Sequence, residues 1–99
     1  MPIGHHNKPL KPKRSLRCGG LLVFKYVYSN GSYLHFLVGR PYGNAIKRSL
    51  LKRRSRSLYL NLLKKLDPLL LGLSIYPIKK NISFKELKGC FALLEKKMI

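Results

Sequence analysis

Hydrophobic and polar positions alternate along two short segments in the first half of the chain, and this alternation predicts β-strands. Leu21–Tyr28 and Tyr33–Val38 are dense in β-branched and aromatic residues. Asn30-Gly31 lies between them and is the preferred pair for a type I′ turn. The sequence therefore predicts a β-hairpin closed by a two-residue loop, and such a loop fixes the strand register.

The predicted hairpin has two unlike faces. One face would carry Leu22, Phe24, Tyr26, Tyr28, Tyr33, His35 and Leu37. The other would carry Leu21, Val23, Lys25, Val27, Leu34, Phe36 and Val38. The second face is the more aliphatic, so we expect it to cover the core, with the amine of Lys25 reaching an edge. The first face ends in an aromatic patch that either stacks unpaired bases or packs across the strands. That patch consists of Tyr26, Tyr28, Tyr33 and His35.

The period then changes from two to that of a helix. Asn44 is a good N-cap, and no Gly or Pro follows before Pro68. The apolar positions that keep helical spacing are Leu51, Leu58, Leu62 and Leu66, widened by Tyr59 and Leu63. We expect a helix that is charged in its N-terminal half, packs through its C-terminal half and stops at Asp67-Pro68.

The last third of the chain predicts one more strand and one more helix. Leu69–Ile78 is a continuous apolar run of the length of a buried strand. Ser83 is expected to cap the final helix, with Glu86 closing a capping box and Ile82 and Leu87 forming a hydrophobic staple. The predicted fold class is therefore α+β, an α/β sandwich in which a small, mainly antiparallel sheet carries its helices on one face.

The net charge of the chain indicates which class of partner it binds. The chain has 99 residues, 21 of them Lys or Arg and 3 acidic, which gives a net charge of +18. Such an excess predicts a polyanionic partner. Residues 1–17 are rich in Pro and basic residues and are expected to form a flexible basic arm, and residues 18–99 a single RNA-binding domain. The apolar runs are too short and too interrupted to span a membrane.

Basic residues concentrate at the start of the predicted central helix. Arg48, Lys52 and Arg56 are spaced four apart and would form one stripe, with Lys47 and Arg53 beside it. Like charges at this spacing repel one another, and no acidic residue is interleaved. A solvated surface is the ordinary alternative, but the missing acids favour an interface with a polyanion, either nucleic acid or an anionic membrane surface. Arg40, in the preceding loop, is added to the candidate RNA-binding residues.

The sequence offers no catalytic site and no metal site of its own. Its three carboxylates are Asp67, Glu86 and Glu95, and two of them are expected to serve helix ends. No pair is placed for acid–base chemistry or for Mg²⁺. The cysteines, Cys18 and Cys90, lack metal-ligand spacing and a disulfide pattern, so a reducing compartment is expected. We also expect no cofactor bound by the protein alone.

One stretch resembles the protein component of bacterial ribonuclease P. In that family a strand leads through a Gly-Asn-Ala turn into a helix that opens Arg-Asn-Arg-x-Lys-Arg, with a further Arg after it. The matching residues here are Gly43-Asn44-Ala45, Arg48-Ser49-Leu50-Leu51-Lys52-Arg53 and Arg56. Ile82-Ser83-Phe84-Lys85-Glu86-Leu87 is similar to the family's Leu-Ser-Phe-Glu-Glu-Leu. Ser49 and Leu50 depart from the signature, and the family's first helix, one wall of its cleft for the 5′ leader, is not recognisable here.

The resemblance implies more than the pattern does. The fold would be that of a ribosomal protein S5 domain, with a left-handed crossover into the basic helix. The partners would be the catalytic ribonuclease P RNA, which supplies the Mg²⁺ and cleaves the leader, and precursor tRNA. Neither DNA nor a membrane would be bound. The setting would be the bacterial cytoplasm or an organelle. A structural ribosomal protein remains the alternative. A membrane-surface binder is disfavoured because its helix must be amphipathic along its whole length, whereas the predicted helix has its charged residues mostly in one half and its apolar residues in the other.

Overall fold

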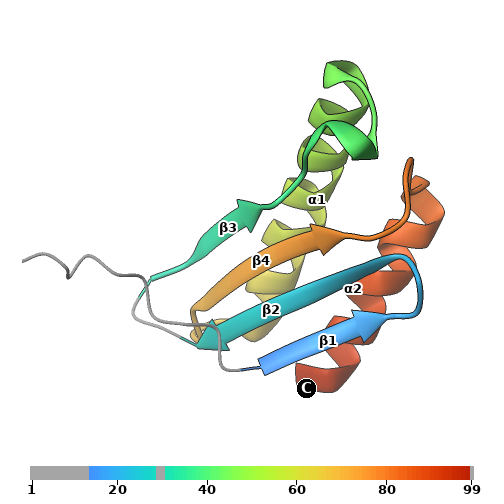
Figure 1. Ribbon diagram of the computed structural model, residues 1–99. Coiled ribbons are helices and arrows are strands. Elements are labelled where there is room, and N and C mark those ends of the chain that lie inside the picture. Colours follow the sequence, from blue (N-terminus) through green and yellow to red (C-terminus); the bar gives the residue numbers. More distant parts are fainter. Residues whose placement is uncertain (1–13, 29–30, 99) are drawn as a thin grey trace, which may run out of the picture.

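The computed structural model describes residues 14–28 and 31–98 as one four-stranded sheet with two helices packed on the same face (Figure 1). The elements are β1 (Arg14–Cys18), β2 (Leu22–Tyr28), β3 (Tyr33–Phe36), the 3-10 turn η2 (Arg40–Tyr42), α1 (Ala45–Leu66), β4 (Leu71–Pro77) and α2 (Phe84–Met98). The strand order is β1-β2-β4-β3, and only the β3–β4 pair is parallel. The predicted fold class, a mainly antiparallel sheet with helices on one face, is confirmed.

The first strand was not anticipated. β1 pairs antiparallel with β2, from Arg14 opposite Tyr26 to Cys18 opposite Leu22. Four of its five residues fall within the segment 1–17 that was expected to be a flexible arm, so the folded region begins earlier than predicted. The signal was weak because an edge strand this short places only two apolar side chains, Leu16 and Cys18, on the core. The remainder of the predicted arm, residues 1–13, lies outside the described residues.

The predicted hairpin is wrong, because β2 and β3 are not paired with each other. β4 lies between them, antiparallel to β2 and parallel to β3. The three strands align Phe24 with Ile75 and Phe36. A two-residue loop would have placed Phe24 opposite Leu37. The apolar β4 is the most buried strand, and inserting it between β2 and β3 covers it with hydrogen-bonded neighbours on both sides.

This register also corrects the face that covers the core. On β2 the side chains of Leu22, Phe24 and Tyr26 face the helices, and Phe24 packs edge-on against Phe91 of α2 with ring centroids 5.0 Å apart. On β3 the expected set, including Leu34 and Phe36, packs against the core as predicted. The predicted core face is therefore wrong for β2 and right for β3. Relative to the predicted hairpin, β2 is shifted by one residue, and such a shift exchanges the two faces of a strand.

The buried stripe of α1 runs from Leu51 to the end of the helix and is not confined to its C-terminal half. Leu51, Ser55, Tyr59, Leu62 and Leu66 are all buried. The expectation that α1 packs only through its C-terminal half is therefore wrong, while the predicted concentration of basic residues in its N-terminal half holds. The small side chain of Ser55 hid the continuity of the stripe from the sequence pattern. The basic residues instead occupy the flanks and the outer side of the helix.

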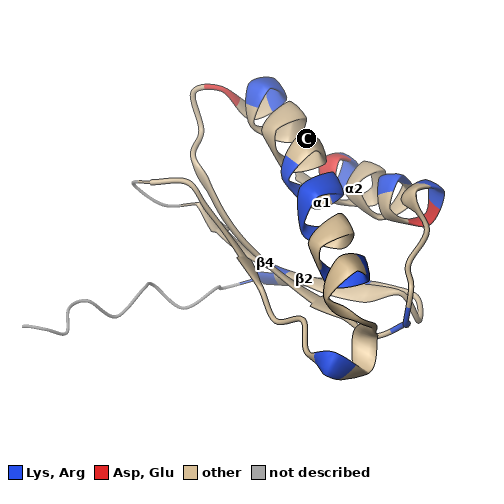
Figure 2. Cartoon of the chain, turned by 90° about the horizontal axis from the view of Figure 1, so that it is seen from above, with Lys and Arg blue, Asp and Glu red and all other residues tan. Residues whose placement is uncertain are grey.

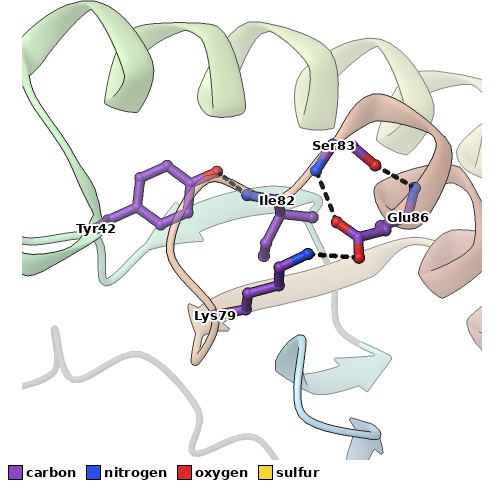
Figure 3. A network of polar contacts seen from close by, with 5 residues as sticks. All are labelled: Tyr42, Lys79, Ile82, Ser83 and Glu86. Atoms are coloured by element: carbon purple, nitrogen blue, oxygen red, sulfur yellow. Dashed lines mark hydrogen bonds and ion pairs between the residues drawn. The ribbon is translucent and has the colours of Figure 1, made fainter.

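The helix ends follow the predicted capping chemistry. The Asn44 side chain accepts the Lys47 backbone N–H at 2.9 Å, and α1 ends at Leu66, before Asp67. Ser83 and Glu86 form the expected capping box, in which the Glu86 N–H donates to Ser83 Oγ at 3.1 Å and the Ser83 N–H donates to Glu86 Oε1 at 2.9 Å (Figure 3). These bonds satisfy backbone donors that a helix start leaves free.

The connection through α1 has an unusual hand. β3 and β4 are parallel neighbours, and α1 links them behind the sheet in the view of Figure 1. With both strands pointing to the upper right, β4 lies to the right of β3 and the helix lies on the far side. That arrangement is a left-handed crossover, as the family resemblance implied and against the general preference.

Candidate nucleic-acid interface

Lys52 and Arg56 lie on the flank of α1 that faces the edge strand β3. A shallow groove of about 400 Å³ runs between them and the strand. Its lining consists of Leu34, His35, Phe36, Leu37, Lys52, Arg56, Ser74 and Tyr76. The groove therefore joins the basic flank of α1 to the face of the sheet opposite α1 and α2, which we call the open face.

Arg48 continues the same stripe but also has a structural bond. Its side chain is half-buried, and Nη1 donates to the carbonyl oxygen of Gly43 at 2.9 Å. The guanidinium thus braces the loop that leads into α1 while keeping further donors for another partner. Removing Arg48 would disturb both the loop and any RNA contact, so it is a poor residue for testing either one alone.

The other predicted cations do not join this stripe. Lys47 lies on the opposite flank of α1, beside Asn81 and Ser83 at the start of α2. Arg53 faces outward, next to Ile46 and Leu50. Arg40 is exposed in η2. The structure therefore distributes the predicted basic residues around α1 instead of gathering them in one patch. Figure 2 shows that Lys and Arg positions recur along both helices.

The four predicted stacking residues are divided between the two faces of the sheet. Tyr26 is only 2% exposed and belongs to the core, so its ring is not available to a base. Tyr28 is two residues further along β2, so it lies on the same face of the sheet as Tyr26, but it is exposed because the strand ends there. Tyr33 and His35 do lie together on the open face, with ring centroids 4.9 Å apart. Half of the predicted patch is thus a real aromatic pair.

Sequence reasoning missed two further residues of the open face. Lys25 Nζ lies 4.9 Å from the centroid of the Tyr76 ring, a cation–π contact between β2 and β4. Lys25 had been expected on the core side, and Tyr76 had been read only as part of an apolar run. The available signal was the alternation of Gly72, Ser74 and Tyr76 within β4, which places the smaller and more polar residues of that strand on one face.

Two of the three acidic side chains form ion pairs away from this groove. Glu95 Oε1 accepts a hydrogen bond from Lys65 Nζ at 2.9 Å, and Glu86 Oε2 accepts one from Lys79 Nζ at 2.6 Å. The hydrogen bonds from Lys79 and from the Ser83 backbone lower the pKa of Glu86 below its ordinary value. No carboxylate lines the groove between α1 and β3 in the described structure. Its cations are therefore left with no acidic partner there, which favours a bound anion.

The thiols are placed as core residues. Cys18 and Cys90 are buried free cysteines, and Cys18 Sγ donates a hydrogen bond to the Cys90 carbonyl oxygen at 3.9 Å. Burial raises the pKa of Cys90 to about 12. A thiol with such a pKa stays protonated near neutral pH and is a weak nucleophile. Within residues 14–28 and 31–98, the His, Cys, Asp and Glu side chains form no group of three that could hold a metal ion.

Neither described helix, α1 or α2, is both long enough and apolar enough to cross a membrane. No family model matches the chain, and no solved structure matches it. A curated relative does match. It is the "Ribonuclease P protein component" of Phytoplasma australiense, which is 33% identical over 87 residues, covering 83% of this chain and 76% of the relative.

Proposed function

Because the chain belongs to the family of the ribonuclease P protein component, we propose that it assists a catalytic RNA in removing the 5′ leader from precursor tRNA. The observation that carries the proposal is the groove in which Lys52 and Arg56 meet the open face across strand β3. In this groove, cationic side chains that can bind phosphates lie next to aromatic rings that can stack on bases. That combination is what a strand of RNA requires of a protein surface.

Each part of the groove has a role in this proposal. Lys52 and Arg56 bind phosphates of the partner RNA, and Arg48 adds a donor where the stripe reaches the loop. Tyr33 and His35 offer a stacking surface for unpaired bases, with Lys25 and Tyr76 beside them. The partners are the ribonuclease P RNA and precursor tRNA, in the cytoplasm of a bacterium. The protein supplies no catalytic group, and the Mg²⁺ that serves the cleavage is held through the RNA.

Salt dependence of RNA binding tests the basic flank. The double variant Lys52→Ala/Arg56→Ala should bind a bacterial ribonuclease P RNA more weakly, and the slope of log affinity against log salt should fall by about 1 to 2. The matched control is Lys64→Ala/Lys97→Ala, which removes the same charge from exposed positions near the helix C-termini. An equal slope change in both variants would show that only net charge matters and would remove the groove from the interface.

Activity tests the function itself. The purified chain should raise the rate at which a bacterial ribonuclease P RNA cleaves precursor tRNA at low Mg²⁺, and Lys52→Ala/Arg56→Ala should raise it less. Crosslinking in cells followed by sequencing of the bound RNA should recover ribonuclease P RNA. Recovery of ribosomal RNA in its place, together with no effect on cleavage, would overturn the proposal in favour of a ribosomal protein.

A further inference from the structure

A second basic cluster lies on the helix layer, built around an exposed aromatic ring. Phe84 is the first residue of α2 and is 41% exposed. The Cζ atom of Arg54 and the Nζ atom of Lys88 each lie 5.4 Å from the centroid of its ring. Arg54 comes from α1 and Lys88 from the next turn of α2. Two helices thus bring two like charges to one ring, and we call these three residues the Phe84 cluster.

No acidic side chain neutralises this cluster. Glu86 is the nearest carboxylate in sequence, but it accepts bonds from the Ser83 N–H and from Lys79. Glu95 accepts Lys65. Asp67 lies beyond the far end of α1, about 20 Å from Arg54 along a helix that rises 1.5 Å per residue. The ring attracts both cations, yet their mutual repulsion remains, and an anion placed between them would relieve it.

A groove continues from the cluster between the starts of the two helices. It encloses about 300 Å³. Its lining consists of Tyr42, Lys47, Leu50, Leu51, Arg54, Asn81, Ile82 and Ser83. Its walls are fixed, because the Ile82 N–H donates to Tyr42 Oη at 2.9 Å and Ser83 is held in the capping box (Figure 3). Lys47 adds a third cation, and no carboxylate lines this groove in the described structure.

This surface is separate from the one that faces β3. Lys52 and Arg56 line the groove beside β3, whereas Arg54 and Lys47 line the groove beside α2. Residues two positions apart on a helix point about 200° apart around its axis. Arg54 therefore projects from the flank of α1 opposite to Lys52 and Arg56. RNA bound at one flank leaves the other flank free for a different segment.

We propose that the Phe84 cluster binds the phosphodiester backbone of a second RNA segment, so that α1 is held by RNA along both flanks. The proposal rests on the proposed function, because the RNA meant is that of the ribonuclease P assembly. The surface suits a phosphate backbone because its cations are spread along an open groove and its ring can contact a ribose or a base. An acidic protein segment is the other occupant of similar charge.

The test uses the full chain and a bacterial ribonuclease P RNA. Arg54→Ala/Lys88→Ala should lower the slope of log affinity against log salt by about 1 to 2 relative to Lys64→Ala/Lys97→Ala. Arg54→Lys/Lys88→Arg, which keeps both charges, should restore the slope. When Arg54→Ala/Lys88→Ala is combined with Lys52→Ala/Arg56→Ala, the two reductions in slope should add, because separate contacts release separate counterions. Thermal unfolding of each variant shows that it is folded.

A readout that does not depend on charge locates the RNA. Cys18 and Cys90 are buried, so an exposed cysteine introduced as Lys85→Cys can be labelled selectively with an iron chelate. Hydroxyl radicals from that site should cut a different RNA segment from those released at a second labelled position, His35→Cys, on the open face. Both sites cutting one and the same segment, or Lys85→Cys cutting none, would overturn the proposal.

The possible failures are distinguishable. If the wild-type chain shows no salt-dependent binding to the RNA, the proposed function fails. If the wild-type chain binds but Arg54→Ala/Lys88→Ala has the same salt slope as the control variant, only the proposed second contact fails. The cluster then serves to hold α1 and α2 together. If the same variant loses binding to polyglutamate while its RNA slope is unchanged, the cluster belongs to an acidic protein segment, and the proposal is again overturned.

Discussion

Gly72 shows how far a single residue shapes the open face. It lies in the middle of the sheet, opposite Val27 on β2 and Tyr33 on β3. A Cβ atom at this position would overlap the ring of Tyr33, so the absence of a side chain allows that ring to lie across β4. A glycine inside an apolar strand is a recognisable sign of close approach. The sequence could point to the position but could not say that Tyr33 fills it.

Replacing Gly72 with Ala should displace Tyr33 and destabilise the protein. We expect a loss of about 1–3 kcal/mol, the usual cost of overpacking, measured by chemical denaturation. Tyr33→Ala provides the control, and the double variant should be less destabilised than the sum of the two single changes, because the clash is absent from it. Simple additivity would contradict the contact between Tyr33 and Gly72.

Elements with strong local signals were predicted well, and pairings between elements were not. The caps at Asn44 and Ser83 and the stop at Asp67-Pro68 were confirmed, since capping depends on residues only a few positions apart. The hairpin at Asn30-Gly31 failed because a local turn preference competed with the burial of β4. β1 was missed because a short edge strand shows little alternation. The hand of the crossover came from the family resemblance and not from the pattern.

The capping box of α2 should be measurable in stability. Ser83→Ala removes the acceptor for the Glu86 N–H and should cost about 1 kcal/mol, whereas Ser83→Asn, which keeps a capping oxygen, should cost little. Thermal unfolding would report the difference. A Ser83→Asn variant as unstable as Ser83→Ala would show that the hydroxyl matters for some reason other than capping.

The same box should respond to acid. The pKa of Glu86 is lowered in the folded state, first by Lys79 and then by the Ser83 backbone. Its contribution is therefore present above the ordinary pKa of a glutamate and is lost as the pH falls through the lower folded value. Glu86→Gln should flatten the decline in stability over that acidic range, followed by circular dichroism. An unchanged decline would assign the acid sensitivity to other groups.

The whole molecule carries far more positive charge than its fold can pair. Its net charge is +18, and the described residues contain two ion pairs, Lys65–Glu95 and Lys79–Glu86. The helix layer has cations on both flanks of α1, while the open face of the sheet carries the aromatic side chains of Tyr33, His35 and Tyr76. Self-repulsion of this size opposes the compact state until a polyanion or salt screens it.

What the sequence determined by itself is the inventory of parts: the class of fold, the helix ends, the apolar strand β4, the excess of positive charge and the resemblance to a known family. These depend on composition and on neighbours within a few positions. Tertiary structure alone decided which strands pair, which face of β2 is buried and which flank of α1 each cation occupies. The physical reason is that burial is shared among distant segments. A one-residue change in register, set by β4, moved Tyr26 into the core and left Tyr33 and His35 on the open face.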